Sequence, residues 1–275
     1  MSTVIAAKPV AAADCPVVEL RQYTLHPGAR NTLIELFERE FIESQEAVGM
    51  SIIGQFRDLD NPDRFVWLRG FADMPSRAQA LAAFYGGPVW KAHRDVANAT
   101  MIDSDNVLLL KPLAVTDDYV TDDGHPDMVD HLLHSHSNTS EELVVITLWY
   151  GSAPAATGFA EFFADRLAPL LAECGGPIVA SFVTEYSTNT FPALPVREGE
   201  HILASVACFA GHAAYARHVA ALTHSSAWRV AQADALAHYL VRSPETLRLA
   251  PTQRSLLRGL QEEAQTLPLS IGGTA

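Results

Sequence analysis

Alternating polar residues near the start of the chain have the types and spacing to act on a small molecule. Glu19, Arg21 and Tyr23 stand two residues apart in "VVELRQYTL" (17–25), and Trp67 and Arg69 do the same in "RFVWLRGF" (64–71). Successive side chains of a β-strand alternate between its faces, so each set shares one face. Arginine offers planar paired donors and tyrosine a single hydroxyl. With an acid beside them, these groups suit a small anionic or carbonyl-bearing ligand.

These residues suggest specific catalytic roles. We expect Arg21 and Arg69 to hold an anion or polarise a carbonyl and Tyr23 to donate a hydrogen bond. Either Glu19 or His93 would move a proton, since histidine titrates near neutral pH. The alternative is that the charged residues pair with one another as structural salt bridges. In that case His93 is an ordinary hydrogen-bonded histidine of a helix.

A second group of candidate residues lies in "GHPDMVDHLLHSHS" (124–137), which contains His125, His131, His134 and His136. Acidic residues flank these histidines, so His131 and His134 with a neighbouring aspartate could bind a divalent ion. The segment could also fold over a pocket as a lid. However, nothing rigid in its sequence would hold metal ligands in place. We interpret it as a solvated connector, and the metal and lid alternatives stay open.

Composition narrows the class of protein. The 275 residues carry a formal net charge of −13, which disfavours nucleic acid and anionic membranes as partners. The sequence shows no apolar run of about 18 residues, as a membrane span would need, and no secretion signal. Three scattered cysteines, Cys15, Cys174 and Cys208, argue against a disulfide framework and favour a cytoplasmic protein.

The motif search leaves the cofactor question open. The chain contains no nucleotide-binding glycine motif, no serine-hydrolase motif and no zinc-ligand spacing. No metal site and no cofactor are therefore predicted, with haem or a metal ion as an open alternative.

The chain contains an internal repeat, which is the strongest indication of its fold. The segment Phe71–Ala99 resembles Phe209–Ala237 at an offset of 138 residues, and both place a tryptophan, Trp90 or Trp228, at the same point. Upstream, "VVELRQYTL" matches "LVVITLWYG" (143–151) at an offset of 126. The offset grows because the second copy carries a longer loop, "STNTFPALPVREGEH" (187–201).

Each copy reads as strand, helix, strand, strand, helix, strand. In the first copy the strands fall near 17–25, 50–58, 64–72 and 106–111, and the helices near 29–47 and 75–99. This order is that of a ferredoxin-like unit, whose sheet has helices on one face only. Two such units can bury their bare faces against each other. The predicted fold class is therefore α+β, with two tandem ferredoxin-like repeats packed sheet to sheet as a pseudo-twofold α+β barrel.

The repeat also sets the domain boundaries. We expect a flexible N-terminal tail over residues 1–14 and a first ferredoxin-like repeat over 15–112. An acidic, histidine-rich linker follows at 113–141, and a second repeat spans 142–251. Residues 252–275 form a C-terminal tail.

Residues of the first repeat resemble a known family. "ELRQYTLHPGA" (19–29), followed by a helix and then "RFVWLRGFADMPSRAQAL" (64–81) and a tryptophan, is similar to the NIPSNAP family of the dimeric α+β barrel superfamily. The second repeat lacks the Pro-Gly turn after its first strand and the tryptophan of its third. Members of this superfamily include cofactor-independent monooxygenases, cyclases, isomerases, and haem-degrading or haem-dependent enzymes, so the resemblance implies an activity of one of these kinds. It also implies pairing through exposed edges and helices, so we expect a homo-oligomer.

The polarity of its residues indicates which way each strand face points. The more aliphatic face should meet the helices, so the face with Glu19, Arg21 and Tyr23 is expected to look into the barrel. The matching residues of the second repeat are smaller or more neutral: Val145, Thr147, Trp149, Ser205 and Ala207. This difference predicts an interior pocket with room on one side and charge on the other. Its expected ligand-binding residues are Trp67, Phe71, Trp149, Ser205 and Trp90.

These observations support two classes of function. The first is a small-molecule enzyme of the α+β barrel type, with monooxygenase, isomerase, cyclase or lyase-like activity on an anionic or carbonyl-bearing substrate. The second is a non-catalytic ligand-binding or scaffold protein. A haem- or metal-dependent barrel enzyme is a further alternative. Fold alone does not choose among them.

Overall fold

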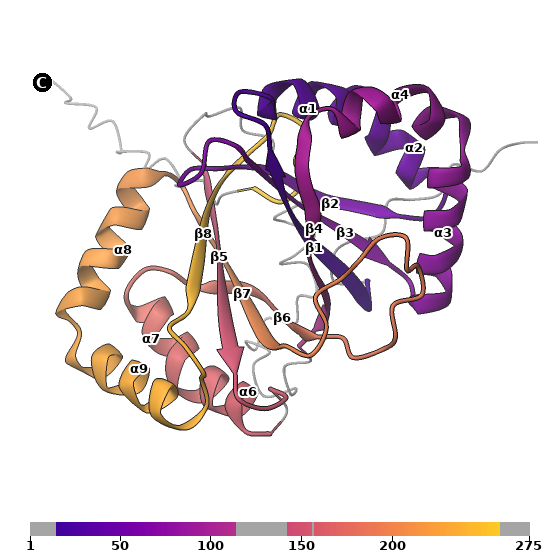
Figure 1. The fold of residues 1–275 in the computed structure, drawn as a ribbon. Helices are drawn as coiled ribbons and strands as arrows, with labels where there is room; N and C mark the ends of the chain where they lie inside the picture. The colour runs from indigo at the N-terminus through magenta and orange to yellow at the C-terminus, as the bar shows by residue number, and fades with distance from the viewer. Residues whose placement is uncertain (1–14, 114–141, 156, 259–275) are drawn as a thin grey trace, which may run out of the picture.

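Each predicted repeat folds into a four-stranded antiparallel sheet with helices on one face (Figure 1). The computed structural model describes residues 15–113, 142–155 and 157–258. The predictions for the N-terminal tail and for the histidine-rich linker fall on residues 1–14 and 114–141, outside the described residues.

The elements follow the predicted order. The first repeat contains β1 (Val17–Leu25), α1 (Arg30–Leu36), η2 (Phe37–Phe41), α2 (Ile42–Glu46), β2 (Ser51–Asp58), β3 (Arg64–Phe71), α3 (Met74–Gly86), α4 (Pro88–Asn98) and β4 (Met101–Pro112). The second contains β5 (Leu143–Gly151), α6 (Phe159–Phe162), η4 (Phe163–Leu167), α7 (Ala168–Glu173), β6 (Ile178–Thr184), β7 (His201–Phe209), α8 (His212–His224), α9 (Ser226–His238) and β8 (Glu245–Pro251).

The two sheets join at both edges into one closed barrel of strand order β1-β3-β2-β8-β5-β7-β6-β4. At one junction β2 pairs with β8 through Phe56 and Pro251, and at the other β4 pairs with β6 through Leu110 and Thr184. Closure leaves no open sheet edge among these strands. The prediction of a pseudo-twofold α+β barrel is confirmed.

The first helix of each repeat contains a π-helical turn at the matching position. The turn η2 spans Phe37–Phe41 and η4 spans Phe163–Leu167, again at an offset of 126. Such a turn inserts one extra residue and rotates the helix surface, and it is common near functional sites.

The second predicted helix of the first repeat is in fact two helices, α3 and α4, which meet at Gly87. A Cβ atom at Gly87 would lie 2.8 Å from the carbonyl oxygen of Ala83, so only glycine fits without a shift. Pro88 then begins α4, where its missing N–H is not needed.

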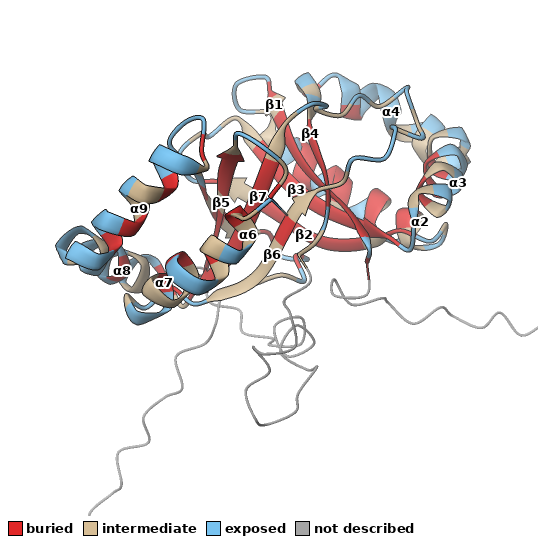
Figure 2. Ribbon diagram, turned by 90° about the horizontal axis from the view of Figure 1, so that it is seen from below, coloured by how far each residue is buried: buried red, intermediate tan, exposed pale blue. Residues whose placement is uncertain are grey.

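The main core lies inside the barrel, between the two sheets. Aliphatic side chains from both repeats form it, among them Val18, Leu20 and Leu68 from one sheet and Val144 and Ile146 from the other. Three further clusters lie between the sheets and their helices, one in the first repeat and two in the second. Figure 2 shows the buried strands at the centre and the helices with exposed outer faces on either side.

The first residues of the predicted C-terminal tail pack against the barrel. The N–H of Leu257 donates to the carbonyl of Ile53 at 2.9 Å, and the N–H of Gln55 donates to Ser255 Oγ at 3.1 Å. Thr252 and Ser255 are buried. Among the described residues, every helix is too short or too polar to cross a bilayer.

Candidate functional site

The polar face of the first sheet looks toward the helices, so its predicted direction into the barrel is wrong. Tyr23, Trp67 and Phe71 pack with Leu33 and Phe37 of the first helix. Glu19 and Arg69 face each other across β1 and β3, as do Arg21 and Trp67, so all of them share this side. The aliphatic residues of the same strands face the second sheet instead.

The reason is that each sheet needs its aliphatic face for the other sheet. The opposing interior face offers Val144, Ile146 and Leu148, which cannot pair with a charge. The helix side offers polar partners from α2 and α3. Buried charges persist only where they find such partners, so the charged face turns to the helices.

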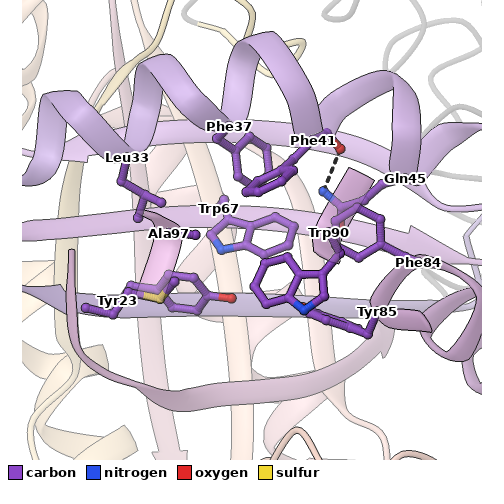
Figure 3. Close-up of a pocket in the computed structure, with 11 residues that line it drawn as sticks. Tyr23, Leu33, Phe37, Phe41, Gln45, Trp67, Phe84, Tyr85, Trp90 and Ala97 are labelled. Carbon is purple, nitrogen blue, oxygen red and sulfur yellow. Dashed lines mark hydrogen bonds between the residues drawn. The ribbon is translucent and has the colours of Figure 1, made fainter. Parts of the chain in front are cut away.

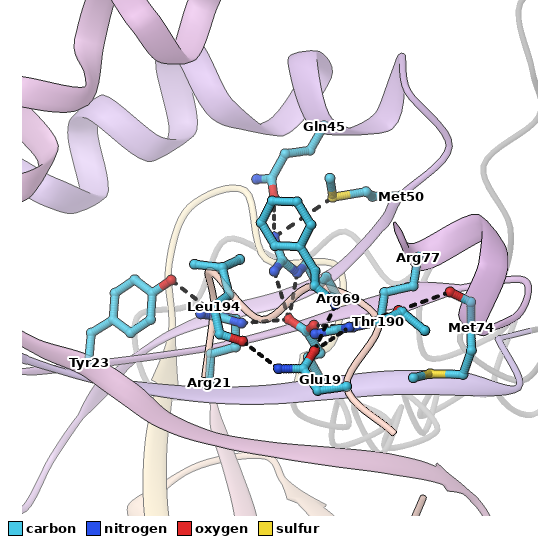
Figure 4. Close-up of polar contacts among 12 residues, drawn as sticks. Glu19, Arg21, Tyr23, Gln45, Met50, Arg69, Met74, Arg77, Thr190 and Leu194 are labelled. Atoms are coloured by element: carbon cyan, nitrogen blue, oxygen red, sulfur yellow. Dashed lines mark hydrogen bonds and ion pairs between the residues drawn. The ribbon is translucent and has the colours of Figure 1, made fainter. Parts of the chain in front are cut away.

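On this side Glu19 is surrounded by three arginines (Figure 4). Its Oε2 accepts hydrogen bonds from Arg21 Nη1 at 2.6 Å and from Arg69 Nε at 2.8 Å. Its Oε1 accepts from Arg77 Nε at 2.6 Å. All four side chains are at most 1% exposed. Three guanidinium groups and one carboxylate leave this buried cluster with two excess positive charges.

Electrostatics fixes the protonation states here. Burial would raise the pKa of Glu19, but the guanidinium groups of Arg69, Arg21 and Arg77 together hold it well below its usual range. Glu19 is therefore a stable carboxylate that organises the arginines rather than a group poised to move a proton. Burial raises the pKa of Tyr23, although Arg21 acts to lower it. The Tyr23 phenol thus stays protonated near neutral pH.

Arg77 comes from α3 and was missed by the sequence interpretation. Asp73 caps this helix by accepting the N–H of Ser76 at 2.6 Å, which fixes the turn that carries Arg77. Arg77 lies on the same helix stripe as the buried Ala80, Leu81 and Phe84. An arginine on an otherwise apolar stripe is the signal that could have identified it.

A cavity of about 30 Å³ lies beside the cluster, between the first sheet and its helices (Figure 3). Aromatic rings form most of its wall: Phe37, Phe41, Phe84, Tyr85 and Trp90. Both phenylalanines of the first helix belong to the π-helical turn. The space suits a small group in an apolar, aromatic setting.

Tyr23, Gln45 and Trp67 bring the polar chemistry to this cavity. Arg21 Nε donates to the Tyr23 hydroxyl oxygen at 3.0 Å, so the hydroxyl hydrogen remains available for a ligand. Arg69 Nη1 donates to Gln45 Oε1 at 3.1 Å, and Gln45 Nε2 donates to the carbonyl of Phe41 at 2.9 Å. The indole N–H of Trp67 is buried without a hydrogen-bond partner in the described structure.

The arrangement can therefore hold an oxyanion. The rings of Tyr23 and Trp67 meet edge to face with centroids 5.9 Å apart, and Figure 3 shows their polar atoms on the same side of the cavity. Two neighbouring donors backed by buried positive charge stabilise a negative oxygen. The residues lining the cavity include no histidine, cysteine or carboxylate, so they provide neither a strong base nor metal ligands.

Several predicted site residues lie away from this cavity. His93 Nε2 is 3.5 Å from a carboxylate oxygen of Glu40, and its side chain is 31% exposed. Phe71 packs beside Arg69, with the guanidinium 5.5 Å from the ring centre. Neither residue is among those that line the cavity. Trp90, by contrast, does line it.

Trp149 and Ser205 lie in the other repeat, so the prediction that they share a pocket with Trp67 is wrong. Trp149 Nε1 donates to Ser205 Oγ at 3.0 Å, and its ring packs among Phe159, Phe163 and Trp228. They were misplaced because the strand faces were inverted: the two polar faces point to opposite sides of the barrel and never meet.

The remaining metal alternatives find little support within the described residues. There, no group of three or more histidine, cysteine, aspartate or glutamate side chains could hold a metal ion. His201, on the face of Ser205, contacts the Tyr186 hydroxyl through Nδ1 at 2.8 Å.

The fold and site together define a tandem α+β barrel whose first repeat carries a polar, aromatic cavity. The NIPSNAP family model matches residues 18–116, so the first repeat is similar to that family. Among curated proteins, none matches the chain.

Solved structures resemble the chain over nearly its full length. An anthrone oxidase-like protein is 15% identical, with 93% of this chain and 99% of that chain covered and a TM-score of 0.56. A candidate monooxygenase from Lactobacillus acidophilus NCFM is 14% identical, covering 90% and 97%, with a TM-score of 0.52. An uncharacterized NIPSNAP-like domain protein from Burkholderia xenovorans is 28% identical over 36% of this chain and 87% of its own, with a TM-score of 0.34. The two full-length likenesses show the barrel fold.

Proposed function

We propose that the protein is a small-molecule enzyme that binds the anion of an acidic enol or phenol in the cavity of the first repeat. The observation that carries this proposal is the excess of buried positive charge beside an aromatic cavity without a base. Such a site favours a substrate that is already ionised near neutral pH, because it can stabilise the anion but cannot readily generate it.

The contacts of the residues around the cavity indicate the role of each in binding the substrate. Tyr23 and Trp67 donate to the substrate oxygen, and Arg21 polarises the Tyr23 hydroxyl from behind. Arg69 acts more remotely by fixing Gln45 in the wall. Glu19 positions the arginines. The aromatic wall, including Trp90, excludes water and packs against a planar substrate.

Molecular oxygen is the proposed second substrate. The names of the two full-length neighbours, an anthrone oxidase-like protein and a candidate monooxygenase, favour this reaction class. In such a reaction the substrate anion gives electrons to O₂ and a new carbon–oxygen bond forms. The net change converts one CH₂ group and O₂ into C=O and water. Isomerase, cyclase and lyase reactions begin with the same stabilised anion, so they are the alternatives within this proposal.

The cavity volume favours one further candidate function, that of a ligand-binding protein without catalysis. About 30 Å³ admits only a small group unless a wall residue moves. Tyr85, Trp90 and Met101 are the lining residues that are only partly buried, so they are the side chains that would have to give way.

A binding titration tests the proposal directly. 4-Nitrophenol ionises near neutral pH and its anion absorbs visible light, whereas 4-nitroanisole has nearly the same shape and cannot ionise. We expect the anion to bind at least about tenfold more tightly than the ether, because only the anion gains the charge-assisted hydrogen bonds. Equal affinity for both compounds would refute the charge-based proposal.

Two variants locate the site. Tyr23→Phe should weaken binding of the anion by about tenfold, the loss of one hydrogen bond to a charged group. Trp149→Phe, at the matching position of the second repeat, should leave binding unchanged. Oxygen uptake with anthrone then separates an oxygenase from a binding protein. If the protein is an oxygenase, the unchanged chain consumes O₂ faster than the Tyr23→Phe variant; if it only binds ligands, the two rates are equal.

A further inference from the structure

A loop from the second repeat reaches the polar cluster of the first. This loop joins β6 to β7 over residues 185–200 and extends toward α3 (Figure 1). Asn189 braces it, because Nδ2 donates to the carbonyl of Leu194 at 2.9 Å and Oδ1 accepts the N–H of Phe191 at 3.0 Å. The N–H of Arg197 donates to the carbonyl of Val107 on β4 at 2.8 Å. The loop is therefore fixed to the first repeat.

Two residues of this loop hold Arg77. Arg77 Nη1 donates to Asn189 Oδ1 at 2.9 Å and to Thr190 Oγ1 at 3.2 Å. Thr190 Oγ1 in turn donates to the carbonyl of Met74 at the start of α3, at 3.2 Å. Phe191 stacks on Tyr85 of the cavity wall, with ring centres 6.0 Å apart and an angle of 23°.

The contacts continue without a gap from the loop to the cavity. Arg77 holds one oxygen of Glu19, and Arg21 holds the other (Figure 4). Arg21 then places Nε on the Tyr23 oxygen. Arg77, Glu19, Arg21 and Tyr23 are all buried, so a change at Arg77 cannot be relieved by water and passes to the next group.

We propose that Asn189 and Thr190 are positioning residues for Tyr23, acting through Arg77, Glu19 and Arg21. The site of the first repeat is then completed by the second repeat. Without the loop, Arg77 can swing away from Glu19, and the carboxylate and Arg21 lose their fixed orientation. The Tyr23 hydroxyl would no longer be held with its hydrogen toward the cavity. This inference rests on the proposed role of Tyr23, but its geometry is testable without any ligand.

The experiment measures hydrogen exchange of arginine Nε–H groups by NMR in the full chain. The Arg21 signal is assigned by its loss in Arg21→Lys. We expect exchange at Arg21 to be at least about tenfold faster in Asn189→Ala/Thr190→Val than in the unchanged protein, the effect of losing a hydrogen bond to a charged group. Thr188→Val is the matched control, because Thr188 is an exposed threonine of the same loop.

The indole N–H of Trp149 provides an internal reference, since it donates to Ser205 Oγ at 3.0 Å in the helix-facing cluster of the second repeat. A loop that acted only through overall stability would change the exchange of Arg21 and Trp149 together. The proposal therefore expects faster exchange at Arg21 with the wild-type rate at Trp149, and a parallel change in both would overturn it. If the double variant does not fold, Thr190→Val alone serves, because it changes little more than the hydroxyl.

Failure of the proposed function gives a different result. Absent 4-nitrophenolate binding in the unchanged protein would count against that function, while the exchange rates would still decide the positioning role. If the anion binds, Asn189→Ala/Thr190→Val should weaken its binding several-fold and Thr188→Val should not.

Discussion

The helix-facing sides of the two sheets differ in polarity at six matching positions. The first repeat has Glu19, Arg21, Tyr23, Gln45, Arg69 and Arg77, whereas the second has Val145, Thr147, Trp149, Leu171, Ala207 and Tyr215. Both sets lie on matching strands, next to matching π-helical turns, and around one shared barrel core. The fold therefore does not require the buried charges, which points to a use for them.

The two interfaces also differ in packing. In the second repeat, Trp149 packs with Phe159, Phe163 and Trp228. In the first, Tyr23 stands in place of that tryptophan beside a cavity. The comparison teaches that at this matching position one repeat packs a tryptophan among aromatic rings, while the other combines charge with open space.

The largest expected effect comes from removing the single carboxylate of the cluster. Glu19→Gln leaves three buried guanidinium groups without their counter-charge, so it should lower the free energy of unfolding by about 3–5 kcal/mol. Urea denaturation measures the change. As a control, Glu19→Val with Arg21→Thr, Arg69→Ala and Arg77→Tyr places the residues of the second repeat in the first. It should recover part of the loss, and a less stable quadruple variant would contradict the comparison.

Acid should reveal the same carboxylate. The pKa of Glu19 is lower in the folded protein than its unfolded value of about 4.3. Its contribution to stability is therefore complete above that pH and is lost as the pH falls through it toward the folded pKa. Unfolding free energies measured from neutral to acid pH should fall more steeply for the unchanged protein than for Glu19→Gln. Identical slopes would mean that Glu19 is not held ionised by the arginines.

Matched alanines test the difference in packing. Ala97 lines the cavity, and its counterpart Ala235 is buried in the cluster around Trp149. Ala235→Val should lower stability by about 1–3 kcal/mol by overpacking. Ala97→Val has space to enter, so it should change stability by less while weakening binding of 4-nitrophenolate. Equal losses of stability would show that the cavity is not open space in solution.

The smallest effect is expected where the first repeat reaches the second. Asp60, in the short turn between β2 and β3, pairs with Arg248 of β8, and both side chains are more than one-third exposed. Arg248→Ala should lower stability by no more than about 1 kcal/mol, because exposed ion pairs contribute little. Thermal unfolding checks this. A loss as large as that of Glu19→Gln would mean that this exposed contact between the repeats contributes as much to stability as the buried charge cluster.

The sequence predicted the barrel well because the repeat determines it. Matching strands at offsets of 126 and 138 residues required two similar sheets, and two sheets with one bare face each have few ways to pack. Helix details were harder. Gly87 divides the second helix for a local steric reason, and the π-helical turns have the same apolar spacing as ordinary helix.

The site was predicted only in part. Glu19, Arg21, Tyr23, Trp67 and Arg69 were correctly placed on one face by alternation, but alternation cannot say which way that face points. Arg77 and Asn189 contribute from a helix and a loop far away in sequence, so no local pattern connects them to Glu19. Trp149 and Ser205 followed the inverted face to the wrong side.

The closed barrel holds both repeats in a single chain, which has a consequence for how such a site can evolve. In a symmetric dimer of one repeat, every substitution appears twice, and an added arginine would be buried on both sides. In a tandem chain, one copy can acquire Arg21, Arg69 and Arg77 while the other keeps threonine, alanine and tyrosine. The duplicated copy can also lengthen one hairpin to serve its neighbour. Joining the two repeats in one chain thus allows each repeat to take a different role within the same fold.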